Sequence, residues 1–101
     1  MTERQRLPNR RAAETFEFET TGLKYTATVG FACGRIIELF LNNHKSNSAA
    51  DTNARDAAIT FSIAVQHGVD PNVIRAALTH SADGTGSGAL SVALDIIKTW
   101  T

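Results

Sequence analysis

The most chemically suggestive segment of this chain is a polar run, His44, Lys45, Ser46, Asn47 and Ser48, between an apolar segment and an alanine-rich one. If a helix starts here, its first N–H groups are unpaired and carry partial positive charge, so they attract anions. Lys45 adds a full positive charge, and the two serine hydroxyls add hydrogen-bond donors. We therefore expect this run to bind a nucleotide or another phosphate-bearing ligand.

A purely structural role is the alternative for the same run. Ser46 or Ser48 would cap the helix, and Asp51, three residues after Ser48, would complete an acidic form of the capping box. No Walker-type glycine pattern precedes Lys45. The sequence leaves both interpretations open.

Other reactive side chains form no recognisable set. The histidines at 44, 67 and 80 lack the short spacing of metal ligands, and Cys33 is the only cysteine. We interpret Cys33 as a small apolar filler, with a reactive thiol beside Arg35 as the alternative. The glycine-rich stretch 84–88 is interpreted as a flexible linker. We therefore expect no catalytic residues, no metal and no cofactor.

Strands are the first elements needed to position this run. Residues 15–20 and 23–31 alternate apolar and polar side chains, as half-buried strands do, and Thr21-Gly22 supplies a turn between them. Tyr25, Val29 and Phe31 should point inward. Residues 35–41 follow as a third strand, apolar on both faces and hence expected to be more buried. Together these runs predict a three-stranded antiparallel meander.

Helices follow the meander. Small and apolar residues recur at helical spacing from 48 to 67, Gly68 suits the end of that helix, and Asp70-Pro71 suits the start of the next. Residues 89–100 repeat the pattern. The predicted fold class is α+β, a three-stranded antiparallel meander followed by two to three helices packed on one face.

Composition bounds the domain organisation and the partners. Residues 1–13 hold four arginines and one glutamate and are interpreted as a flexible basic arm, whereas 14–101 form a single domain. Lys plus Arg and Asp plus Glu each number 10, and this balance argues against duplex nucleic acid. A lone cysteine and a polar N-terminus favour the cytoplasm. No apolar run approaches the roughly 20 residues of a membrane helix.

The chain contains the segments ELFL at 38–41, KSNS at 45–48, VQHGVDP at 65–71 and IRAAL at 74–78. These segments and the order of the elements resemble the TSCPD domain, which is best known as the C-terminal module of adenosylcobalamin-dependent ribonucleotide reductases and is also found in short stand-alone proteins. The resemblance covers about residues 15–97. The Thr-Ser-Cys-Pro-Asp motif that names the family is replaced by TGSGAL at 85–90, so no role of its cysteine carries over.

The resemblance implies a stand-alone, non-catalytic accessory domain that binds a nucleotide, another anion or a reductase-related partner protein. The reductase barrel and its cobalamin site would not fit in 101 residues. The alternative is a structural, homo-oligomer-forming module without a small-molecule site, because a small sheet leaves unpaired edges. Single-stranded nucleic-acid binding through Tyr25 or Phe31 ranks last, because these aromatic side chains lie on the expected core face.

Overall fold

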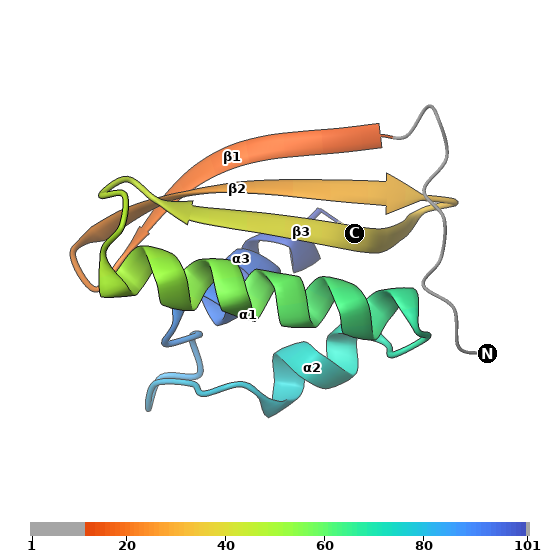
Figure 1. Ribbon diagram of the computed structural model, residues 1–101. Helices are drawn as coiled ribbons and strands as arrows, with labels where there is room; N and C mark the ends of the chain where they lie inside the picture. Colours follow the sequence, from red (N-terminus) through yellow and green to blue (C-terminus); the bar gives the residue numbers. More distant parts are fainter. Residues whose placement is uncertain (1–11, 101) are drawn as a thin grey trace.

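The structure, a computed structural model that describes residues 12–100, has one layer of sheet and one layer of helices (Figure 1). The strands β1 (Ala12–Thr20), β2 (Leu23–Ala32) and β3 (Arg35–Asn43) pair antiparallel in the order β1-β2-β3. The helices α1 (Ala49–Gln66), α2 (Pro71–Ala77) and α3 (Ala89–Lys98) follow. Figure 1 shows them on the same side of the sheet. The predicted α+β meander is confirmed.

Both hairpins close through tight turns whose residues suit them. Thr21 and Gly22 have φ values of 53° and 77°, and Cys33 and Gly34 have 54° and 76°. Positive φ at both central residues is the geometry of the hairpin turn that matches strand twist, and glycine adopts it without strain. Cys33 is exposed in its turn. Its interpretation as an apolar filler is therefore wrong, because a turn tip has no core to fill.

The first strand begins earlier than the sequence suggested. Ala12 and Ala13, assigned to the arm, pair with Phe31 and Gly30 because β2 is long enough to offer them partners. Residues 1–11 of the expected arm lie outside the described residues. The third strand likewise continues to Asn43, which pairs with Tyr25.

The core lies between the sheet and the helices, and the alternation in β2 is confirmed. The third strand is the most buried of the three, as its apolar composition predicted, although Phe40, on the face without helices, has 52% of its surface exposed. In an antiparallel sheet covered on one side, only alternate residues reach the core. The core is built from Tyr25, Ala27, Val29, Leu39, Leu41, Ala54, Ala58, Phe61, Val65, Ala93, Leu94 and Ile97.

Helix α1 lies along β3 and satisfies the backbone of that edge strand. The Ser62 hydroxyl accepts from the N–H of Leu39 at 2.8 Å and donates to its C=O at 3.1 Å. The Gln66 amide donates to the C=O of Ile37 at 2.6 Å. An uncovered edge would offer these groups to another chain, so α1 closes this side of the sheet.

The predicted connection between α1 and α2 is confirmed. Gly68, with φ 98°, donates to the C=O of Val65, and Val69 donates to the C=O of Ala64, which is the Schellman pattern at a helix end. The Asp70 side chain then accepts from the N–H of Asn72, with Pro71 at the first helical position.

The stretch before α3 is folded back on itself, and its interpretation as a flexible linker is wrong. Ser81 donates to the C=O of Thr85 at 2.7 Å, and His80 and Gly86 form an isolated β-bridge. The N–H of Gly86 donates to the Asp95 carboxylate at 3.0 Å, which fixes the loop to α3. Glycines permit the tight turn, but hydrogen bonds decide its conformation.

Candidate functional site

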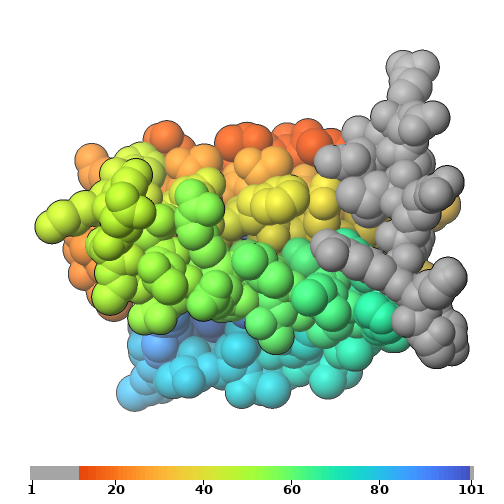
Figure 2. Space-filling model, in the orientation of Figure 1, coloured from red at the N-terminus to blue at the C-terminus, as the bar shows by residue number. Residues whose placement is uncertain are grey.

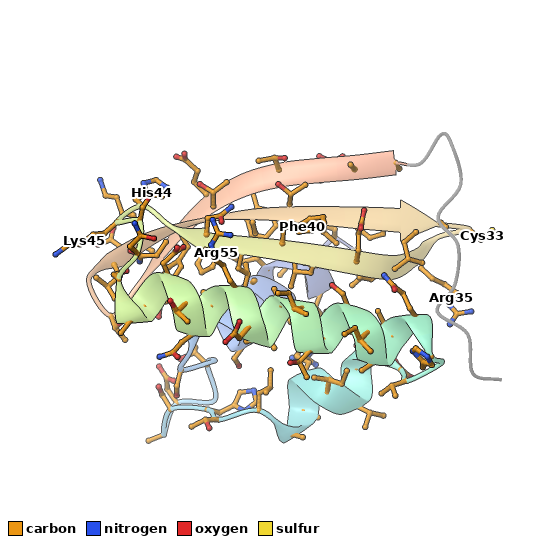
Figure 3. All side chains as sticks on the ribbon, viewed as in Figure 1. Cys33, Arg35, Phe40, His44, Lys45 and Arg55 are labelled. Carbon is orange, nitrogen blue, oxygen red and sulfur yellow. The ribbon has the colours of Figure 1, made fainter. Side chains whose placement is uncertain are left out.

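The five predicted site residues lie together in the loop between β3 and α1, which projects at one end of the molecule (Figures 2 and 3). Ser48 is the N-cap of α1, and its hydroxyl accepts from the N–H of Asp51 at 3.1 Å. The same hydroxyl donates to the C=O of Lys45 at 2.7 Å. The capping role predicted for Ser48 is confirmed, and its hydroxyl is already paired in both directions.

Asp51 places an internal carboxylate at the start of α1. Its Oδ1 accepts from the N–H of Asn43 at 2.9 Å, and its Oδ2 accepts from Arg55 Nε at 3.1 Å. Donation by the Asn43 N–H, followed by the Arg55 guanidinium, holds the pKa of Asp51 below its usual value of 3.8. This side chain is buried. The negative charge of Asp51 thus balances part of the positive charge at the start of α1. The proposed capping box predicted this carboxylate at the helix start, but not its bonds to Asn43 and Arg55.

The remaining loop residues present few converging donors. His44 Nε2 lies 3.0 Å from the Thr26 hydroxyl and 3.9 Å from the Glu17 carboxylate. The N–H of Lys45 donates to the Asn43 side chain at 2.9 Å, whereas the Lys45 ammonium is exposed. Ser46 and Asn47 are also exposed. The loop gathers the predicted residues, and anion binding there stays a prediction.

The opposite end of the domain holds a hollow that sequence reasoning missed. It has a volume of about 390 Å³ and lies between the β2–β3 turn, the start of α2 and the end of α3. We call it the basic cleft because Arg35, Arg75 and Lys98 line it. These residues are far apart in sequence, so no local motif marks them. Its apolar floor consists of Phe31, Ile36, Leu94 and Ile97.

The two arginines in the basic cleft differ in whether an ion pair holds the side chain. Arg75 Nη1 is fixed by the Asp95 carboxylate at 3.0 Å. Arg35 is exposed and makes no ion pair with any described residue (Figure 3). Asp70, also in the lining, uses its carboxylate to cap α2. The cleft therefore combines an apolar floor, a fixed guanidinium and one that a ligand can engage.

Within residues 12–100, no three His, Cys, Asp or Glu side chains are grouped closely enough to hold a metal ion. Among the helices of the same residues, none combines the length and apolar character needed to span a bilayer.

Comparison with known proteins gives a relationship to ribonucleotide reductases. A stretch of 68 residues, 66% of this chain, is 40% identical to part of a vitamin B12-dependent ribonucleotide reductase of Agrobacterium fabrum (strain C58 / ATCC 33970). The chain spans about 5% of the length of that protein. No protein-family model matches the sequence, and no solved structure matches it. The similarity supports a reductase-related domain, whereas membership of the TSCPD family stays a prediction.

Proposed function

We propose that this chain is a non-catalytic accessory domain, related to ribonucleotide reductase, that binds a nucleotide-type ligand in the basic cleft. The observation that carries the proposal is the convergence of Arg35, Arg75 and Lys98 around an apolar floor. Ligand sites are commonly concave and apolar, with a few placed polar groups. A base would pack on Phe31 and Ile36, and a phosphate would meet the guanidinium groups.

Arginine suits this role better than lysine does. Its planar guanidinium can form paired hydrogen bonds to phosphate oxygens, and it is always charged. The ion pair with Asp95 holds the Arg75 side chain in place before a ligand arrives. Arg35 then contributes a positive charge that is paired with no described carboxylate and is available to a phosphate.

The loop at His44, Lys45, Ser46, Asn47 and Ser48 is proposed as a second anion contact. Its support is the exposed Lys45 ammonium at the start of a helix. A reductase-related partner protein could supply the anion there as an acidic side chain. Because Asp51 already occupies part of the helix end, this contact should be weaker than the basic cleft.

Titration calorimetry of the full chain with ADP, dADP, ATP and dATP tests the proposal. We expect Arg35→Ala to weaken nucleotide binding by about tenfold or more, the loss of one charge-assisted hydrogen bond. Lys45→Ala tests the loop contact and should weaken binding less than Arg35→Ala does. Lys24→Ala, which removes an exposed cation outside both proposed contacts, is the matched control and should leave the affinity unchanged. The reverse result would move the site to the loop, and no binding by the wild type would refute the ligand-binding function.

An oligomer-forming structural module is the second candidate function. The observation in its favour is β1, which pairs with β2 along one side and has no described strand on its other side. Its pairing with a second copy would cover that edge. The formal net charge of zero leaves little repulsion between copies.

A further inference from the structure

One acidic side chain is buried on the face of the sheet that the helices leave uncovered. Glu38 of β3 pairs with Gly30 of β2, and by the alternation along β3 it lies on the same face as Phe40. Glu38 is 5% exposed and Gly30 is buried, whereas Phe40, two residues further along the strand, is 52% exposed. The burial is therefore confined to one part of an otherwise open face.

The neighbours of Glu38 among residues 12–100 do not account for this burial. Gly30 has no side chain, and the next residue across the sheet is Ala13 of β1, which is small and exposed. The helices lie on the other face (Figure 1). Arg35, the cation of β3, lines the basic cleft and makes no ion pair with a described residue. A glycine within a strand commonly marks a place where another backbone approaches closely.

The charge of Glu38 indicates what kind of segment covers it. A buried carboxylate is unfavourable unless a cation pairs with it, and Glu38 does not lack a partner. Residues 1–11 hold four arginines and one glutamate and lead directly into β1 at Ala12. The adjacent Ala13 lies in the same row across the sheet as Gly30 and Glu38. Eleven extended residues span up to about 35 Å, whereas three neighbouring strands are only about 10 Å across.

We infer that the basic segment 1–11 docks on the face of the sheet without helices and that one of its arginines pairs with Glu38. The segment joins β1 beside the row that it covers, and its charge is opposite to that of the buried carboxylate. Thr101, the other residue outside the described part, follows α3 on the opposite face of the sheet. The occupant of this surface is therefore the chain's own N-terminal segment.

Limited digestion of the full chain with trypsin tests the inference, because trypsin cuts after arginine and needs an accessible backbone. Glu38→Gln keeps the size of the side chain and removes its charge. We expect this variant to be cut within residues 1–11 about tenfold faster than the wild type, which corresponds to the loss of one charge-assisted hydrogen bond. Glu19→Gln, which removes an exposed carboxylate of the same face, is the matched control and should be cut at the wild-type rate. Mass spectrometry identifies the bonds that are cut.

NMR spectra of the ¹⁵N-labelled full chain give a second test that changes no residue of the sheet, so it applies even if Glu38→Gln does not fold. Replacement of the four arginines of residues 1–11 by glutamine should shift the amide signals of Gly30 and Glu38 and leave that of Asn42, at the other end of β3, unchanged. The wild-type signals should not move on dilution. The inference is overturned if Glu38→Gln is cut at the wild-type rate, if the arginine variant leaves the Gly30 and Glu38 signals in place, or if dilution of the wild type shifts them, which would assign the cover to a second copy.

Discussion

At the scale of single residues, three buried polar side chains of α1 pair with backbone groups of β3. Asp51 pairs the N–H of Asn43, Ser62 pairs both groups of Leu39, and Gln66 pairs the C=O of Ile37. A buried backbone group without a partner is costly, so each of these side chains replaces a strand that β3 lacks. Ser91 departs from this pattern, because its enclosed hydroxyl bonds to no described residue.

Asp51 should make the stability of the domain depend on pH in acid. Its folded-state pKa lies below 3.8, first because of the Asn43 N–H, so its contribution is present above that pH and is lost as the pH falls through the folded pKa. We expect Asp51→Asn to lower stability at pH 7 and to flatten the loss of stability below about pH 4.

Urea denaturation between pH 2 and pH 7 measures this effect, with Asp56→Asn on the exposed side of α1 as the control. Asp83, whose pKa is lowered first by the Thr85 N–H, titrates in the same range and remains in both variants. An Asp51→Asn protein with the wild-type acid profile would contradict the assignment.

Gly86 is required by a close approach between backbones. An added Cβ would overlap the Ser91 side chain and come within 2.8 Å of its carbonyl carbon. We expect Gly86→Ala to lower the free energy of unfolding by roughly 1–3 kcal/mol, the usual cost of overpacking. Chemical denaturation measures it. Gly88→Ser, where the added Cβ meets nothing, is the control and should be neutral or slightly stabilising, because serine caps helices well.

At the scale of elements, α1 does more than cover the core. It follows β3 closely enough for its side chains to reach the strand's free backbone groups, and its ends are fixed by Ser48 and Gly68. The sheet therefore has one closed edge at β3 and one at β1 without a described neighbour. This asymmetry is what makes β1 the candidate for assembly.

Ser62→Ala tests the closed edge. The variant leaves the N–H and C=O of Leu39 buried and unpaired, so we expect a loss of roughly 1–3 kcal/mol in the free energy of unfolding. Thr60→Ala on the exposed face of the same helix is the control and should change stability little. Equal denaturation midpoints for the two variants would show that the Ser62 contacts do not matter.

At the scale of the whole molecule, the domain carries candidate sites at both ends and an open strand on one side. The basic cleft lies by the β2–β3 turn, and the loop of residues 44–48 lies at the start of α1. Helix α3 contributes Leu94 and Lys98 to the basic cleft, whereas the loop of residues 44–48 leads into α1. A short chain can thus present separate surfaces without a second core.

Glu17→Pro tests assembly through β1. The N–H and C=O of Leu39 point toward α1, so those of its partner Val29 point toward β1, where Val29 pairs with Glu14. Backbone groups alternate in direction along a strand, so the N–H of Glu17 points to the open edge. Proline there removes a donor from the edge but none from the sheet. For the oligomer-forming function we expect a wild-type dimer by light scattering, a Glu17→Pro monomer and a Glu17→Ala dimer. A wild-type monomer at every concentration would rule this function out.

The sequence by itself determined the elements and their order, because hydrophobic period and turn chemistry are local. The alternation of 23–31, the turn at Thr21-Gly22 and the helix end at Gly68 each depend on neighbours a few residues away. The capping role of Ser48 was predictable for the same reason. The ends of the strands were harder to predict from the sequence, because Ala12 and Asn43 join strands only through partners elsewhere in the chain.

Only the tertiary structure decided where the candidate sites lie. Arg35, Arg75 and Lys98 meet because a turn, a short helix and the last helix converge, and nothing in their spacing predicts it. The stretch 84–88 looked flexible by composition, yet the bond from Gly86 to Asp95 fixes it against α3. Contacts between distant segments depend on how the chain packs, whereas the composition of a segment indicates only how flexible its own backbone can be. For that reason the polar run at 44–48 was visible in the sequence, and the basic cleft was not.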